Sequence, residues 1–408
     1  MSDKSLIEDI PFDGDTSKPL PESLKKVRRT HINYSMKLLE QPEFQQSPAD
    51  ELLTRFLAYG KPPEQAVIDE SEQEELNRVR LDVEIEAIKR RQFEKRQAQE
   101  KIEAAYRSVD LMLGNNLEKV LDKPIKFIGN HKDLGFYKVI CSELGAEHLS
   151  VNQFAGIVES CSWITQDYIR IANNSMVRSD LQATNAPEAT DVKSAINILG
   201  VANASCLFPR LIIEYNYRQH AGLAKDMWNR LIKFQQLSSI AAYKLARHFG
   251  LDGDHLFLTS ALSALPYMAF LNMYTSEAKR AKLASYNKAL SLQDDFRLSV
   301  LDNYEPGSEL LYKLYHFAPS FTTLAIDSLN LIHLPAVSTL EGESGFEDRQ
   351  LLLRRAQGFA TFRLLLSAKL IEPEQANGFL KAHNIDQVSL DVLQNIDFAR
   401  INLYKMRD

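Results

Sequence analysis

The side chains best suited to bind a metal ion are spread widely through this chain. Nine histidines occur, at positions 31, 131, 148, 220, 248, 255, 316, 333 and 383. A metal site on one helix face needs ligands three or four residues apart, and no two histidines have that spacing. None is followed directly by Asp. The pattern predicts no bound metal or other cofactor, although a site assembled from distant residues stays open.

Motifs for phosphate binding and nucleophilic catalysis are also missing from the sequence. Neither G-x-G-x-x-G nor G-x-x-x-x-G-K-S/T occurs, and there is no G-x-S-x-G. The three cysteines, Cys141, Cys161 and Cys206, form no C-x-x-C pair, which argues against a zinc knuckle and fits a reducing cytosol. Cys161 is expected to be a buried, inert thiol. The sequence therefore predicts no catalytic residue.

The run LFLTSALSALPYMAFLNMYTS, residues 256–276, contains no charged residue and no histidine. Its length suits a membrane span, a reaction pocket or a buried helix. Six Ser, Thr and Asn side chains and Pro266 disfavour a membrane span, and no Lys/Arg cluster precedes the run. We therefore expect a core helix, in which the small residues Ser260, Ser263 and Ala264 let neighbouring helices approach closely.

Length and charge limit the broad class of protein. The chain has 408 residues, of which 45% are hydrophobic, and a formal net charge of -6. This balance is ordinary for a globular protein and gives no electrostatic case for nucleic acid as a partner. The N-terminal stretch MSDKSLIEDIPFDGD is acidic and lacks a long apolar run. We expect no signal peptide, no membrane span and a cytoplasmic location.

Changes in composition divide the chain into four parts. Residues 1–65 are a polar, partly loose N-terminal segment with a helix near 49–58, and residues 66–114 are a long charged helix. Residues 115–340 are a compact multi-helix domain, and residues 341–408 are a C-terminal helical extension. The predicted fold class is all-α, because alternation of strand period is largely missing and only residues 126–142 leave room for a strand. The charged residues 277–305 are expected to form a surface excursion.

Local signals mark where the helices begin and end. Residues suited to N-caps precede five predicted helices, at Ser150, Thr165, Asp191, Asp226 and either Asp252 or Asp254. Three positions suit helix ends or turns, namely Asn173, Gly200 and Gly250. The long charged helix is expected to stop near Gly114, where Asn115 and Asn116 follow.

The long charged helix is the first candidate for a contact surface. From residue 70 to residue 110 there is neither Gly nor Pro, and acids precede bases at i,i+4 spacing. A set of apolar residues along it could serve dimerisation or docking, namely Val79, Val83, Ile102 and Val109. The alternative, that these residues pack on the chain's own core, is equally open.

Three sequence stretches and their order along the chain carry a resemblance to a known family. They are DYIRIANNSMV (167–177), TDVKSAINILGV (190–201) and AAYKLARHFGLDGDHLFLTSALSALPYMAF (241–270). Together they resemble the HDOD domain, a module related to the HD phosphohydrolases and found in bacterial signalling proteins. A weaker fourth match is LIHLPAVSTL at 331–340. The resemblance covers residues 144–340, about half of the chain, and implies an HDOD-like helical domain.

The resemblance also implies where metal ligands would lie. HD hydrolases hold a divalent metal with an earlier helix His, an adjacent His-Asp pair and a later Asp, and the metal activates water. The earlier His falls near Phe234 and the pair falls on Ser263 and Ala264. Phe and Ala offer no lone pair, so these are vacated ligand positions. Only structural markers carry over from the resemblance. Asn174 and Ser175 are expected as helix caps, Gly200 as a turn and Pro335 as a helix start.

By resemblance, the chain is expected to be a non-catalytic regulatory protein of bacterial signal transduction. It would act through protein–protein contacts of the HDOD-like domain, and a homodimer is one expected form. Two other classes stay open. One is a small-molecule sensor of nucleotide type, with an apolar pocket between the central helices. The other is a divergent HD-type metal-dependent phosphohydrolase, which would require stoichiometric metal together with turnover.

Overall fold

The computed structural model describes residues 48–60, 82–121, 150–219, 223–316, 318, 339–340, 344–371, 376–394 and 396. Within these ranges every regular element is an α-helix, which confirms the prediction of an all-α fold. The segment 126–142, where a strand had room, lies outside them. The helices are α2 (Pro48–Tyr59), α4 (Asp82–Val120), α6 (Val151–Glu159), α7 (Ser162–Ala172), α8 (Ser175–Asp180), α9 (Val192–Leu199), α10 (Val201–Gln219), α11 (Lys225–His248), α12 (Gly253–Ser263), α13 (Leu265–Ser291), α14 (Asp295–Asp302), α15 (Ser308–Tyr315), α18 (Glu347–Ser367), α19 (Ala376–Ala382) and α20 (Gln387–Gln394).

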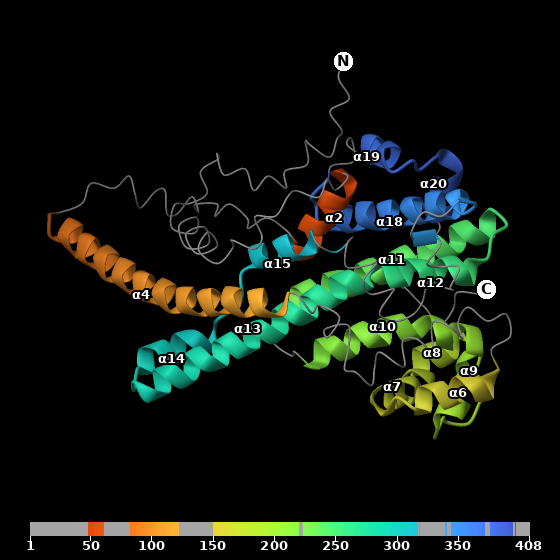
Figure 1. Cartoon of the computed structure of the whole chain (residues 1–408), viewed down its shortest axis with the longest axis horizontal. Coiled ribbons are helices and arrows are strands. Elements are labelled where there is room, and N and C mark those ends of the chain that lie inside the picture. The colour runs from red at the N-terminus through yellow and green to blue at the C-terminus, as the bar shows by residue number, and fades with distance from the viewer. Residues whose placement is uncertain are drawn as a thin grey trace, which may run out of the picture.

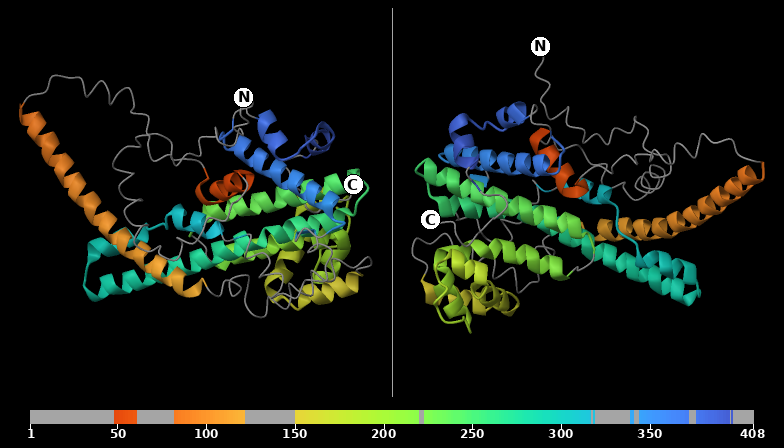
Figure 2. Two further views of the ribbon diagram at one scale, coloured as in Figure 1. Left: turned by 45° about the horizontal axis from the view of Figure 1, so that its top comes forward. Right: turned by 180° about the vertical axis from the view of Figure 1, so that it is seen from behind.

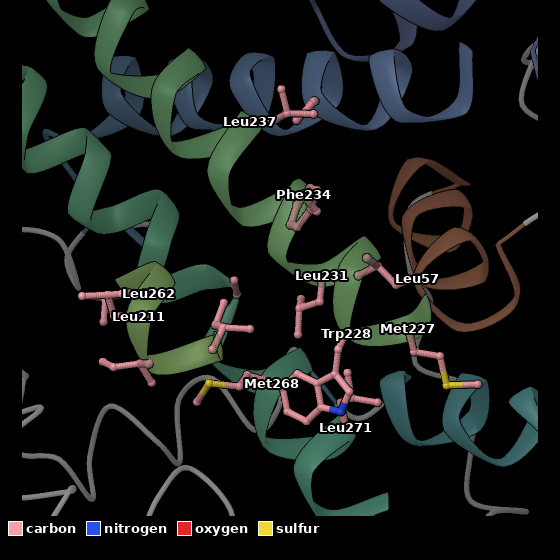
Figure 3. Close-up of a cluster of buried hydrophobic side chains, with 14 of the residues drawn as sticks. Leu57, Leu211, Met227, Trp228, Leu231, Phe234, Leu237, Leu262, Met268 and Leu271 are labelled. Carbon is pink, nitrogen blue, oxygen red and sulfur yellow. The ribbon is translucent and has the colours of Figure 1, made fainter. Parts of the chain in front are cut away.

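Helix α11 forms the centre of the fold (Figure 1). Fifteen of its 24 residues are buried, because α12, α18, α10 and α2 all pack around it. Figure 3 shows Trp228, Leu231 and Phe234 projecting from successive turns of α11, with Leu57 of α2 and Leu271 of α13 nearby. Burying side chains of this size stabilises a fold by about 1.5–3 kcal/mol each. The core therefore gathers around one helix.

The described parts of the two terminal segments belong to this same core. Helix α2 confirms the helix predicted near 49–58, and its Leu57 is fully buried. Helix α18, from the predicted C-terminal extension, lies along α11 and buries Phe359 and Leu365. Both helices contribute to one continuous apolar cluster with α11. In these parts the chain completes the central bundle instead of flanking it.

Several predicted caps are confirmed. Ser150 and Asp191 each form a capping box at the start of α6 and α9. Asp252 accepts the backbone hydrogens of Asp254 and His255 at 2.9 and 3.3 Å, so it opens α12. Gly200 has a φ of +77°, a conformation that favours glycine, and α9 and α10 meet there at 112°. Local sequence signals therefore place most of these helix ends correctly.

Three predicted boundaries are wrong, by up to six residues. Helix α7 begins at Ser162, ahead of Thr165, and α11 begins at Lys225, ahead of Asp226. Helix α4 continues through Gly114 to Val120. Leu113 and Leu117, on either side of that glycine, are buried. Their packing outweighs the cost of a helical Gly, which is about 1 kcal/mol.

The uncharged run forms parts of two helices. Helix α12 ends at Ser263, and α13 begins at Leu265 with Pro266 in its first turn, where proline is tolerated. Taken together, α12 and α13 are long and apolar enough to cross a membrane, and 83% of the apolar window is buried inside the protein. The bent pair α9 and α10, taken together, is also long and apolar enough to cross a membrane. The expected burial in the core is confirmed, but the run forms parts of two helices, whereas one helix was expected.

Residues 277–305, expected as a surface excursion, are mostly helical. Helix α13 continues to Ser291, and α14 turns back beside it. The C-terminal half of α4 packs on both helices. Figures 1 and 2 show these three helices extending together from the central bundle. We call this unit, residues 104–120 and 277–304, the arm.

Small residues explain why α13 and α4 pack in the arm. The buried residues of α13 between 278 and 289 are all small and recur every three or four positions: Ala278, Ala281, Ser285 and Ala289. Helix α4 contributes larger buried side chains at similar spacing, namely Val109, Leu113 and Leu117. Side chains of one helix can then fill the shallow groove of the other. The stripe is inconspicuous in sequence because charged residues surround it.

Candidate functional site

The three positions at which the resemblance places HD ligands lie within the central bundle. Phe234 on α11 is 1% exposed and packs in the core (Figure 3). Ala264 is fully buried at the joint between α12 and α13. Ser263 Oγ donates to the carbonyl of Ser260 at 2.6 Å and accepts from Gln357 Nε2 at 2.8 Å. Because Gln357 belongs to α18, the C-terminal helix lies directly against this end of α12.

Neutral polar side chains are buried on α11 and α12. Gln235, Ser239, Thr259 and Ser260 are each 0% exposed. Gln235 Nε2 donates to Ser239 Oγ at 3.4 Å, and Thr259 Oγ1 donates to the carbonyl of His255 at 2.9 Å. Gln235 Oε1 and Ser260 Oγ have no hydrogen-bond partner among the described residues. These groups do not ionise near neutral pH, so they offer hydrogen bonds without acid–base catalysis.

Metal-binding side chains do not cluster in the described ranges. In that part of the chain, no group of three or more His, Cys, Asp or Glu is placed to hold a metal ion. Cys161 and Cys206 are both buried, as predicted for Cys161. Cys141 lies outside the described residues. The described side chains therefore supply no set of ligands for metal-assisted hydrolysis.

One buried carboxylate, Asp167 on α7, escaped the sequence analysis. It is 4% exposed and accepts hydrogen bonds from Arg170 at 2.7 Å and from both terminal nitrogens of Arg218 on α10. Burial by itself would raise the pKa of Asp167. The hydrogen bonds and charges of the two arginines outweigh burial and lower that pKa. Arg170 is visible in sequence three residues away, whereas Arg218 is brought close only by folding.

Stability should depend on the ionisation of Asp167. Because its folded pKa lies below the unfolded value of about 3.9, its ion pairs stabilise the fold above that pH and are lost as the pH falls through the folded pKa. We expect Asp167→Asn to lower the free energy of unfolding by about 1–3 kcal/mol at pH 7. The difference should shrink as the pH falls from about 5 to 2. Urea unfolding of both proteins across this range measures it, and a difference that persists in acid would contradict the argument.

The structural markers carried by the resemblance have mixed outcomes. Asn174 is a true N-cap, since its side chain accepts from the backbone nitrogens of Met176 and Val177. Ser175 is not a cap but the first residue of α8. Gly200 forms the turn between α9 and α10, as predicted. Pro335 lies outside the described residues.

Two polar contacts fasten α14 to α4 within the arm. Tyr304 donates its hydroxyl hydrogen to Asp110 Oδ1 at 2.5 Å, and Arg297 donates to Ser108 Oγ. Burial raises the pKa of Asp110, although the hydrogen bond from Tyr304 opposes this. Burial also raises the pKa of Tyr304, which is 2% exposed. These contacts fix the geometry of the arm.

The arm carries half of the exposed large apolar side chains. Ten such residues occur among the described residues, and five of them lie in the arm: Leu111, Leu283, Leu290, Leu292 and Phe296. Four of these five fall within residues 283–296, at the outer end of the arm. Single apolar side chains on a surface are normal, but a group of them marks an interaction site.

No family model matches the chain. No curated protein matches it at the threshold applied, and neither does any solved structure. The function of the chain is therefore inferred from the chemistry and exposure of the described residues. They combine a bundle interior with buried neutral polar side chains on α11 and α12 and an arm whose outer end exposes apolar side chains.

The contact residues predicted on the long helix are placed differently from one another. Val79 lies outside the described residues, and for Val83 only the helical backbone is described. Ile102 is partly exposed. Val109 is 0% exposed and belongs to the core cluster, so for this residue the alternative of packing on the chain's own core is correct. The exposed apolar side chains of α13 and α14 were missed, because their neighbours in sequence are charged.

Proposed function

We propose that this protein is a non-catalytic regulatory protein that acts by binding another protein. The binding surface is the arm face, which we define as Leu283, Leu290, Leu292 and Phe296. The observation that carries the proposal is the exposure of these side chains, which is 59%, 50%, 63% and 44% respectively. Interface cores are enriched in aromatic and apolar side chains and depleted in charge.

The arrangement of the arm face supports this role. Leu283 and Leu290 are seven residues apart on α13, so they lie on the same side of that helix. Ala281 and Ser285, two positions either side of Leu283, are buried on the opposite side. Leu283 and Leu290 therefore point away from the arm's own core, and Leu292 and Phe296 extend the exposed apolar surface at the end of the arm. The Tyr304–Asp110 contact holds the supporting helices in place, so little conformational entropy is lost when the arm face binds a partner.

The chemistry of the central bundle supports a non-catalytic role. Phe234 and Ala264 offer no lone pair at two of the positions where HD hydrolases keep metal ligands, and Ser263 is hydrogen-bonded to α18. The resemblance to HDOD domains supports a place in bacterial signal transduction. The cytoplasmic location follows as part of the same proposal.

Replacing two residues of the arm face tests the proposal. We expect Leu290→Asp combined with Leu292→Asp to weaken binding of the native partner by about tenfold or more, because a buried hot-spot side chain contributes about 1–2 kcal/mol or more. The partner is identified by affinity capture from the native cell, and its binding to the purified wild type and variant is then measured by calorimetry.

A matched control uses apolar residues of similar exposure away from the arm. Met176 and Val388 are 63% and 50% exposed. The variant Met176→Asp combined with Val388→Asp should bind the partner as the wild type does. Equal binding by the arm variant and the wild type would show that the arm face is not the binding surface.

A further inference from the structure

The N-terminal half of α4 projects away from the other described helices. Figures 1 and 2 show the half that begins at Asp82 extending beyond α13 and α14, with no described helix beside it. The aromatic contact that fastens α4 to the end of α14 lies further along, where Tyr106 meets Tyr304 edge to face. Phe93, in the projecting half, is 62% exposed.

A projecting helix of this kind gains little packing from the other described helices. Most helical stability in proteins comes from packing an apolar face, and exposed i,i+4 ion pairs contribute only about 0.2–0.5 kcal/mol each. The projecting half is nevertheless helical from Asp82 onward. A second helix laid along it would cover Phe93 and add an apolar contact.

The charges of this half identify the second helix. By sequence, residues 82–88 contain three acidic residues and no basic one, whereas residues 89–96 contain five basic residues and one acidic one. A parallel pair of such helices would set like charges opposite each other. An antiparallel pair would set the acidic block of each helix against the basic block of the other. Charge pairing of this kind selects partner and orientation in helix–helix association.

We propose that this protein self-associates through the projecting half of α4, paired antiparallel with the same half of a second copy. The interface is separate from the arm face, so the dimer presents two arm faces to other proteins. It is held by interlocking charge blocks around the apolar residues of the segment, and its affinity falls as ionic strength rises.

Reversing one charge block at a time tests the interface. Asp82→Lys, Glu84→Lys and Glu86→Lys together change the first block from -3 to +3, by the sequence charges. Lys89→Glu, Arg91→Glu and Lys95→Glu together change the second block from +4 to -2. Each triple variant is expected to raise the dimer dissociation constant by about tenfold or more, because like charges then face each other. Sedimentation equilibrium of the full chain measures the constant.

Combining all six substitutions in one chain tests the orientation. The two blocks have then exchanged sign, so an antiparallel pair is attractive again and should regain the wild-type dissociation constant. A parallel pair would remain repulsive. Circular dichroism checks that each variant keeps its helix content. A wild-type chain that stays monomeric at every concentration reached would overturn the proposal. A variant with all six substitutions that stays helical but monomeric would overturn it too.

Spin-label distances in the unreversed dimer give a second measure of orientation. Arg90 and Lys101 are both exposed on α4, and each takes a single label after replacement by Cys on a background without the native cysteines. Antiparallel pairing centred near residue 89 predicts a short distance for the first label and roughly 36 Å along the helix axis for the second. Short distances for both labels would overturn the antiparallel arrangement. Substituting Leu290 and Leu292 of the arm face should leave dimerisation and the label distances unchanged, so either proposal can be contradicted without the other.

Discussion

Gly358→Ala is expected to lower the free energy of unfolding by about 1–3 kcal/mol, as overpacked cores do. Gly358 lies in the middle of α18, where His383 packs directly on the helix backbone. A Cβ added there would lie 2.3 Å from His383 Cγ and 2.6 Å from His383 Cβ. These atoms are next to the histidine backbone, so the ring cannot move aside alone. The segment that follows α19 would have to shift away from α18.

Two comparisons isolate the steric cause of this effect. Gly156→Ala in α6 meets nothing within 4 Å and should be neutral or stabilising by about 0.5–1 kcal/mol. The double variant Gly358→Ala with His383→Ala should cost less than the sum of the two single changes, because the obstacle is removed. Chemical denaturation of the four proteins measures the coupling. Additive losses would show that the close approach has no energetic consequence.

Arg230→Met is expected to destabilise the protein by about 2–4 kcal/mol and to release α2 from the bundle. Arg230 on α11 donates to the carbonyls of Leu57 and Ala58 at 3.1 and 2.8 Å, at the C-terminal end of α2. Both of these residues are 0% exposed. Met preserves much of the side-chain volume but leaves both carbonyls without a donor, and charge-assisted hydrogen bonds contribute about 1.5–3 kcal/mol each.

Hydrogen exchange distinguishes the release of α2 from general destabilisation. In Arg230→Met the backbone amides of α2 should lose protection before those of α11. Arg210→Met is the matched control, since Arg210 makes a partly exposed ion pair with Glu214 within α10 and touches no carbonyl of α2, so this change should cost about 1 kcal/mol or less. If the amides of α2 keep their wild-type protection in Arg230→Met, Arg230 does not hold that helix.

The junction at Arg230 also shows how closely α2 fits. Gly60, just after α2, has a φ of +66°, and an added Cβ would lie 2.6 Å from Arg230 Nη1. Burial lowers the pKa of Arg230, with Tyr315 and Asp226 opposing that change. An arginine half-buried at a helix end therefore connects two segments that are more than 170 residues apart in the chain.

The candidate sites could be predicted only in part. The resemblance places the HD ligand positions at Phe234, Ser263 and Ala264, and the side chains of Phe and Ala cannot bind metal wherever they lie because they have no lone pair. The hydrogen bond between Ser263 and Gln357 could not be predicted, since 94 residues separate the two. The arm face was hidden for a similar reason. Leu283 and Leu290 look like part of a charged excursion until the small residues opposite them are seen packed on α4.

The sequence by itself determined that the described chain is helical and where many helices begin. Capping by Ser150 and Asp191 and the turn at Gly200 involve only residues three or four positions apart, so their signals can be read locally. Tertiary structure alone decided that α2 and α18 join the bundle around α11, that Asp167 meets Arg218 and that residues 277–304 fold onto α4. These outcomes depend on contacts between distant segments, whose packing energy also overrides local preferences such as the stop signal at Gly114.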